Sequence, residues 1–252
     1  MVTRRLLTSA LALLLAILLP VSASACVFAP VCYDLHSVRT GNTVRTRHTP
    51  AKPPLRPLWE TGSRPTEPDF SEVTGVQLII VDSVGNAAVL RLYEKVNGVW
   101  TAVSEPMDGR LGKNGVTTDK REGDGCTPAG LYSLTEAFGV QPLPSSGLPY
   151  RQAGPDSYWV DDPDSQFYNT WGEGRENADW QSAEHLTDYP ALYAYAAVID
   201  YNRDPVVPGK GSAIFLHCGA NPTAGCVSTA EENIIRILEW LDPTASPQIL
   251  IR

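Results

Sequence analysis

Residues 76–103 read VQLIIVDSVGNAAVLRLYEKVNGVWTAV, and this stretch decides the fold class. Three short runs of aliphatic, β-branched and aromatic residues, at 76–81, 88–93 and 99–103, are separated by Gly85-Asn86 and by Asn97-Gly98. Asn-Gly between two such runs is a strong signal for a two-residue hairpin turn. The stretch therefore predicts three adjacent antiparallel strands.

Working outward from this stretch, further short strands are predicted at 131–134, 158–160, 193–199, 212–218 and 248–251. A single helix is predicted from about Thr229, because Ser228-x-x-Glu231 and Thr229-x-x-Glu232 are overlapping capping boxes. An apolar face at helical spacing follows, and Asp242-Pro243 ends the helix. The expected fold is mainly β, a sandwich or barrel with one well-defined helix.

The first 25 residues have the pattern of a signal peptide. Arg4 and Arg5 precede an apolar run at 6–19, and Ala23-Ser24-Ala25 forms a small-residue cleavage site. The run is too short to span a bilayer as a helix. We expect an exported chain, without a transmembrane span after maturation, that begins near Cys26. Residues 26–72 are predicted to be a Pro-rich, poorly ordered tether, and residues 73–252 the folded domain.

The charge balance narrows the class of partner. The chain has 20 basic and 28 acidic residues, a formal net charge of −8, and loss of Arg4 and Arg5 with the leader makes it more negative. This composition gives no reason to expect binding to nucleic acid or electrostatic attachment to anionic lipid.

Five cysteines in an exported chain leave one thiol unpaired if the others form bridges. With Cys226 free, Cys26–Cys32 and Cys126–Cys218 is the preferred pairing among three connectivities, since the first pair is local. Cys26 at the cleavage site is also where a lipoprotein would carry its lipid. Simple secretion is favoured over a lipid anchor, because Ala23 stands where the lipoprotein signal usually has Leu.

The segment that carries candidate chemistry is residues 212–228, SAIFLHCGANPTAGCVS. A predicted strand ends at His217, and a short loop leads to Gly225-Cys226 just before the predicted helix. The helix dipole and an imidazolium would both lower the pKa of Cys226. Gly225 would let a substrate carbonyl approach, and nearby backbone N–H groups would hold an oxyanion. His217 would act as the base.

Two other interpretations of this segment stand beside the catalytic one. A cysteine at a strand–helix junction is commonly inert, and a His and a Cys nine residues apart are a weak signal. A zinc site from His217, Cys218 and Cys226 has no obvious fourth ligand. The Gly-rich stretch at 109–130 lacks the Gly-Lys-Ser/Thr ending of a phosphate loop, so a structured loop is expected there.

The segment resembles the active-site signature of the L,D-transpeptidase (YkuD-like) family, in which a His closes a strand and Ser/Thr-x-Gly-Cys follows. Here those positions are His217 and Thr223-Ala224-Gly225-Cys226. Residues 123–130, GDGCTPAG, resemble the family's Thr-Pro-x-Gly element, and residues 160–169 resemble a subgroup of these enzymes. Together the resemblance covers roughly residues 74–252.

The resemblance implies a cell-wall enzyme that needs no cofactor or metal. Cys226 would attack a peptidoglycan tetrapeptide stem, release the terminal D-residue, and pass the acyl group to an amine of a neighbouring stem to form a cross-link. The chain would act in the cell wall, periplasm or extracellular space. Catalytic candidates are Cys226, His217 and Gly225. Candidates for substrate binding are Asn221, Thr223, Ala224, Asp161, Asp162 and Asn169, although turn or capping roles compete for the last three.

The chain also departs from the family pattern. Many members carry a second His before Gly-Cys and Arg or Asn after it, where this chain has Ala224, Val227 and Ser228. These departures leave substrate handling and acceptor choice open. An L,D-carboxypeptidase with water as acceptor, or an inactive domain that binds wall peptides, are the alternative functions. A papain-like peptidase is disfavoured, because His217 precedes Cys226 in the chain.

Overall fold

The computed structural model describes residues 69–142 and 145–252. The predicted signal peptide and nearly all of the predicted tether, with Cys26 and Cys32, lie outside the described residues. All the described residues belong to one compact unit.

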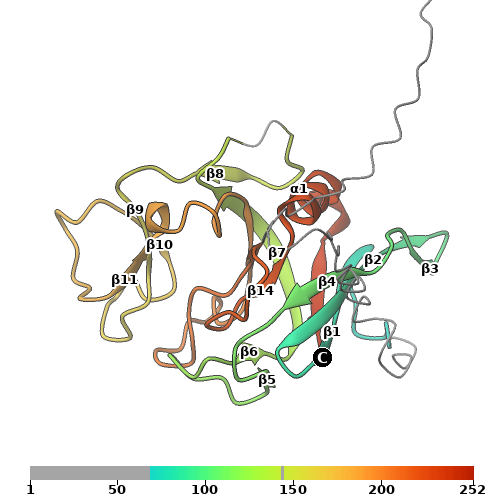
Figure 1. The fold of residues 1–252 in the computed structure, drawn as a ribbon, viewed down its shortest axis with the longest axis horizontal. Coiled ribbons are helices and arrows are strands. Elements are labelled where there is room, and N and C mark those ends of the chain that lie inside the picture. The colour runs from blue at the N-terminus through green and yellow to red at the C-terminus, as the bar shows by residue number, and fades with distance from the viewer. Residues whose placement is uncertain (1–68, 143–144) are drawn as a thin grey trace, which may run out of the picture. The chain divides into compact units, whose positions relative to one another are not determined.

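The described residues form a mainly β domain with one α-helix, as the sequence predicted (Figure 1). The α-helix, α1, spans Glu231–Trp240, and the 3-10 turns η2 and η3 span Leu186–Asp188 and Pro243–Ala245. The strands are β1 (Gln77–Val84), β2 (Ala87–Val96), β3 (Val99–Ala102), β4 (Met107–Arg110), β5 (Val116–Thr117), β6 (Thr127–Pro128), β7 (Gly130–Gly139), β8 (Tyr150–Gln152), β9 (Ser157–Val160), β10 (Trp171–Glu173), β11 (Ala183–His185), β12 (Ala196–Ile199), β13 (Phe215–Cys218), β14 (Val227–Thr229) and β15 (Gln248–Ile251).

The principal sheet closes on itself. Its strand order is β1-β15-β7-β12-β13-β14-β4-β2, and β2 pairs with β1 to complete the ring, while β3 and β8 are side branches. The three N-terminal strands pair antiparallel as predicted. Asn97 and Gly98 have φ angles of 51° and 82°, so both take the left-handed conformation that an Asn-Gly hairpin turn requires. A closed ring leaves no long unpaired sheet edge.

The side chains of β1 point alternately to the two faces of the sheet and contribute to two apolar layers. Ile79 and Val81 belong to the main core, while Leu78 and Ile80 pack on the other face with Phe70 and Trp100. Successive side chains of a strand point to opposite faces, so a run of consecutive apolar residues is buried on both sides. The same alternation governs β13, where Leu216 and Cys218 join the main core and Phe215 faces away from it.

Helix α1 packs its apolar face, through Ile234, Ile237 and Leu238, into the main core. It begins two residues later than predicted, and the capping boxes are not formed. Ala230 is the N-cap residue and makes no side-chain cap bond. Thr229 instead lies in β14, and its hydroxyl donates to the Asp108 carbonyl at 2.7 Å. Pairing of β14 with two neighbouring strands therefore prevails over the local capping signal.

A smaller sheet, in the order β10-β9-β11, forms a separate lobe on the left of Figure 1. Trp159 of this lobe packs edge-to-face on Phe215 of β13, with ring centroids 4.9 Å apart. Phe138 and Tyr193 belong to the same buried cluster, and so does Cys226. The lobe therefore covers the face of β13 that carries the candidate site. None of the helices in the described ranges has the length and apolar character of a bilayer span.

Candidate active site

The register of two parallel strands places His217 and Cys226 on the same face. His217 of β13 lies opposite Ser228 of β14, and Cys226 is two residues before Ser228. Residues two apart on an extended chain point to the same side. Both side chains are buried, with 4% of His217 and 6% of Cys226 exposed, and both line one pocket of about 470 Å³.

The Cys226 thiol is held by two backbone groups, one in the segment before β13 and one at the first residue of β13. Its Sγ–H donates to the Ala213 carbonyl at 3.2 Å, and the Phe215 N–H donates to Sγ at 3.4 Å. Within the described residues, no hydrogen bond joins Sγ to the His217 ring. The resting thiol is therefore protonated and directed at Ala213. Catalytic hydrogen bonds are often absent or long until substrate binds.

Asn169 fixes the backbone that holds this thiol. Its side-chain oxygen accepts from Trp159 Nε1 at 3.0 Å and from the Ala213 N–H at 3.1 Å. Its amide group donates to the carbonyls of Tyr201 and Asn202. Ala213 has a φ of 52°, a conformation that costs an alanine about 1–2 kcal/mol. The bond from Asn169 offsets that cost and keeps the Ala213 carbonyl turned toward Cys226.

The tautomer of His217 follows from its backbone contact. Nδ1 lies 2.7 Å from the Cys218 carbonyl, which can only accept, so a neutral ring carries its proton on Nδ1. Nε2 is then the unprotonated nitrogen and is free to take a proton. Tyr193 packs edge-on against the ring, with centroids 5.5 Å apart, and limits its rotation.

Burial keeps both groups neutral, which corrects the expectation of a lowered thiol pKa. Burial raises the pKa of Cys226 to about 12, and the nearby Glu184 carboxylate adds to the rise, against weaker opposing effects of the Phe215 N–H and the Lys120 charge. Burial also lowers the pKa of His217. The expected help from the helix is absent because β14 separates Cys226 from α1. The resting pair is a thiol and an imidazole, not an ion pair.

The connecting loop contributes four predicted residues to the pocket lining: Asn221, Thr223, Ala224 and Gly225. The Thr223 hydroxyl donates to the Cys226 carbonyl at 2.7 Å and accepts from the Gly225 N–H at 3.1 Å. The Gly225 N–H is therefore already used. Among the described residues, the Cys226 N–H has no acceptor, which makes it the better candidate donor to an oxyanion.

Gly225 stands at a closely packed position beside the pocket. A Cβ at this position would lie 3.1 Å from the Cys126 carbonyl oxygen and 3.2 Å from Ile214 Cδ1. Both contacts are tighter than ordinary van der Waals distances, so a side chain here would require Cys126 of the 109–130 loop or Ile214 to shift by a few tenths of an ångström.

The three predicted residues of the 160–169 segment separate in the structure. Asp161 lines the pocket, and its Oδ1 is buried without a hydrogen-bond partner in the described part of the chain. Asp162 accepts from the N–H groups of Asp164 and Gln181, which is the turn role weighed from sequence. Neither Asp162 nor Asn169 is among the lining residues.

The polar pocket residues that sequence reasoning missed include Lys120, Glu122, Glu184 and Ser228. Glu122 accepts from the hydroxyls of Tyr168 and Ser212. Glu184 accepts from the Tyr193 hydroxyl, and burial raises its pKa to about 7. The Ser228 hydroxyl is fully buried and lacks a hydrogen-bond partner in the ranges described. Glu122 lies in the Gly-rich 109–130 stretch, which was expected to be a structured loop, whereas Glu184 comes from a segment that no motif marks.

The predicted disulfide bond between Cys126 and Cys218 is wrong. Cys126, Cys218 and Cys226 are all free thiols, so the predicted Cys126–Cys218 bridge is not formed. Cys218 lies in the main core on the opposite side of β13 from His217, and Cys126 is part of the 109–130 loop. The same geometry argues against the zinc interpretation. In the described ranges, no group of three or more His, Cys, Asp or Glu side chains is placed to hold a metal.

Comparison with known proteins matches these features to one family. The model of the L,D-transpeptidase catalytic domain (YkuD) matches residues 77–250. Among solved structures, the helical cell shape determining protein Pgp2 from Campylobacter jejuni is similar, at 15% identity and a TM-score of 0.37, over 71% of this chain and 48% of that one. The chain thus spans about half the length of that protein. No curated protein matches the chain.

Proposed function

The chain belongs to the L,D-transpeptidase (YkuD) family, and on this premise we propose that it transfers acyl groups between peptidoglycan stem peptides, with Cys226 as nucleophile and His217 as base. The observation that carries the proposal is the placement of both side chains on one face of β13 and β14, in a single pocket. The His217 tautomer, with Nε2 unprotonated, supports the role of base.

The first half-reaction would start from the neutral pair. His217 Nε2 takes the proton of Cys226 as Sγ attacks the carbonyl before the terminal D-residue. The S–C bond forms, the scissile C–N bond breaks, and the proton passes to the leaving amine. General-base transfer suits a thiol with a raised pKa, because the charge develops only when the substrate is in place. The Cys226 N–H would donate to the oxyanion.

The second half-reaction would use an amine as acceptor. A neutral amine attacks the thioester carbonyl, the C–N bond forms, and the C–S bond breaks. The proton of the amine returns to Sγ through His217. Carboxylates of Glu122, Asp161 and Glu184 line the same pocket. They would attract an incoming ammonium group, which gives up one proton to solvent before it attacks as the neutral amine, and this attraction supports transpeptidation over hydrolysis by water.

Export completes the proposal. The signal-peptide pattern at 1–25 would place the enzyme outside the cytoplasmic membrane, where peptidoglycan stems are found.

Mass spectrometry tests the acyl-enzyme directly. The mature protein and Cys226→Ala are incubated with a tetrapeptide stem or a carbapenem, and tryptic peptides are mapped. We expect an adduct on Cys226 of the wild type and none on the variant. An intact Cys226 after long incubation with both reagents would contradict the proposal.

Product analysis then distinguishes transfer to an amine acceptor from hydrolysis by water. With a second stem peptide present, a transpeptidase yields a cross-linked dimer. A carboxypeptidase yields only the shortened stem, whatever the concentration of the second peptide. His217→Ala is expected to abolish both products, because no other described ring nitrogen lines the pocket.

A further inference from the structure

A buried lysine beside the nucleophile has no part in the mechanism above. Lys120 is 4% exposed and lines the same pocket as Cys226. Its Cε would lie 3.6 Å from a Cβ built on Gly225, so the end of its side chain lies over the residue next to the nucleophile. Full burial of a lysine is rare unless its charge is paired.

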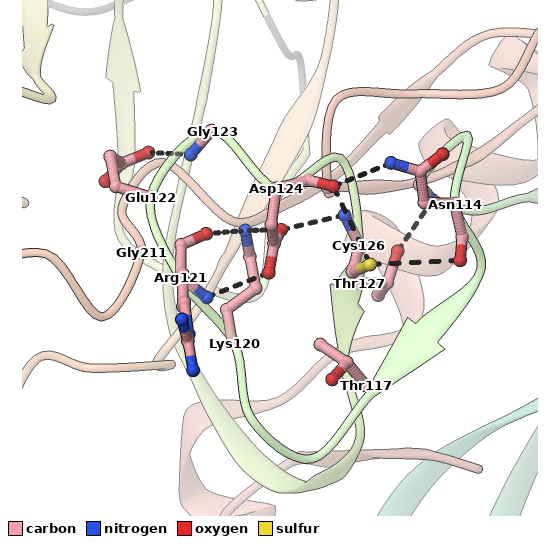
Figure 2. Close-up of polar contacts among 12 residues, drawn as sticks. Asn114, Thr117, Lys120, Arg121, Glu122, Gly123, Asp124, Cys126, Thr127 and Gly211 are labelled. Atoms are coloured by element: carbon pink, nitrogen blue, oxygen red, sulfur yellow. Dashed lines mark hydrogen bonds and ion pairs between the residues drawn. The ribbon is translucent and has the colours of Figure 1, made fainter.

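The loop holds the Lys120 ammonium at a fixed point. Nζ donates to Asp124 Oδ1 at 2.6 Å and to the Arg121 carbonyl at 2.9 Å, as Figure 2 shows. An ammonium has three N–H donors. In the part of the chain that the structure describes, these are its two hydrogen-bond partners, which leaves one donor for a ligand.

Asp124 is itself anchored by the backbone. It accepts from the Arg121 N–H at 2.8 Å and from the Cys126 N–H at 2.8 Å, on either side of a tight loop (Figure 2). Gly123 and Gly125, each with a φ of 70°, allow the chain to reverse around this carboxylate. Burial raises the pKa of Asp124, but the bonds from Lys120 and the two N–H groups outweigh it and lower the pKa overall. The anchor therefore stays ionised.

Lys120 is the fixed positive charge of the pocket. The lining contains the carboxylates of Glu122, Asp161 and Glu184, and in the described ranges its basic side chains are Lys120 and His217. Burial lowers the pKa of His217, so that ring is neutral near neutral pH. An anionic group of a substrate would meet repulsion in most of this pocket, and attraction only near Lys120.

The proposed donor carries such a group close to the reacting carbonyl. In a stem that ends in a D-residue, only one Cα atom separates the scissile amide from the terminal carboxylate. We propose that Lys120 is the specificity-determining residue that binds this free carboxylate and so selects stems with an unblocked C-terminus. The identity of this ligand rests on the proposed function, whereas the charge and position of Lys120 do not.

Binding to an inactive protein tests the inference without turnover. Calorimetry with Cys226→Ala compares two probes, a tetrapeptide stem with a free C-terminal carboxylate and the same peptide as a carboxamide. Because a hydrogen bond to a charged group is involved, we expect the carboxylate to bind about 10- to 100-fold more tightly. In Cys226→Ala/Lys120→Met, the two peptides should bind equally, with the carboxamide affinity little changed.

Control variants exclude a general effect of charge or of the loop. Lys210→Met removes a nearby, half-exposed lysine that contacts Asp119 and does not line the pocket, and it should keep the full preference. Lys120→Arg keeps the charge and should restore part of the preference. Equal loss of affinity for both peptides in Lys120→Met would make Lys120 a support of the loop and overturn the inference.

Two further outcomes remain decisive. If Lys120→Met does not fold, as judged by circular dichroism, the parent Cys226→Ala protein still tests the inference. Equal affinity of this protein for the carboxylate and the carboxamide peptide overturns it. Acylation of the wild type reports separately on the proposed function. A Lys120-dependent preference for the carboxylate peptide without acylation of Cys226 would support the carboxylate site and contradict the proposed enzymatic function.

Discussion

The environment of the Cys226 thiol stabilises its neutral form. Sγ has a backbone carbonyl as acceptor, a carboxylate nearby and almost no contact with water. Each of these disfavours the thiolate relative to an exposed cysteine. In the proposed reaction, nucleophilicity would therefore appear only when substrate brings the thiol and His217 together.

Alkylation of the substrate-free protein should show that the Cys226 thiol is neutral and weakly reactive. Since burial raises the pKa of Cys226 to about 12, iodoacetamide should label it slowly at pH 7, and the rate should still be rising at pH 10. Of the three described cysteines, Cys126 is partly exposed and should be labelled first. Peptide mapping by mass spectrometry separates the sites. A plateau in the Cys226 rate below pH 8 would contradict the neutral pair.

Removal of the Glu184 charge should make the thiol more acidic. An ionised Glu184 disfavours the thiolate, so Glu184→Gln should lower the pKa of Cys226 and speed its alkylation at pH 9. Glu173→Gln is a matched control on β10, outside the pocket lining, and should leave the rate unchanged. Equal rates in wild type and Glu184→Gln would show that the carboxylate does not act on the thiol.

At the scale of elements, Asn169 joins the small lobe to the segment before β13. It is 2% exposed, and its four hydrogen bonds connect Trp159 of β9, Ala213, Tyr201 and Asn202. The amide therefore sets how the lobe covers the site and where the Ala213 carbonyl points. A buried polar group with all its partners satisfied specifies one arrangement of the chain.

Asn169→Ala should lower the free energy of unfolding by about 3 kcal/mol, because it leaves several buried groups without partners. It should also slow acylation of Cys226, because the Ala213 carbonyl loses its support. Chemical denaturation measures the first effect and mass spectrometry the second. Asn233→Ala on α1 removes a single side-chain bond, to Thr229, and serves as the control. A loss below about 1 kcal/mol at Asn169 would contradict this role.

At the scale of the whole molecule, burial of Glu184 links stability to pH. Its pKa is raised to about 7 in the folded protein, above the ordinary carboxyl value. The unfolded chain therefore releases this proton at lower pH than the folded one. The contribution of Glu184 is fully present below about pH 4.5 and is lost as pH rises through about 7.

Wild type should accordingly lose more stability than Glu184→Gln between pH 4.5 and pH 7.5. The denaturation midpoint of each protein, measured at both pH values, gives the comparison. Groups distant from Glu184 titrate alike in the two proteins, so the difference reports on Glu184 together with Asp161 and Glu122, whose charges are coupled to it. An equal change of the denaturation midpoint in wild type and Glu184→Gln between the two pH values would show that the pKa of Glu184 is not raised.

Local signals along the chain predict the class of fold, which the structure confirms, and the two candidate reactive residues. Regular strand runs, Asn97-Gly98 and the apolar face of α1 are local signals, and the structure confirms the strands and the helix they predict. The site motif likewise lies within one short segment, from His217 to Cys226. Local patterns can specify such features because their physical causes, turn conformation and side-chain alternation, act over a few residues.

The chemical surroundings of those two residues depend on contacts between segments that are distant in the sequence. Ser228 and Thr229 pair in β14 and do not form the predicted helix caps. The predicted Cys126–Cys218 bridge is not formed, because the Cys218 side chain points from β13 into the main core. Lys120 and Glu184 reach the pocket from distant segments. The pKa of a thiol depends on burial and on charges that the closed barrel and its lobe assemble around it. These are properties of the folded chain, which no local motif encodes.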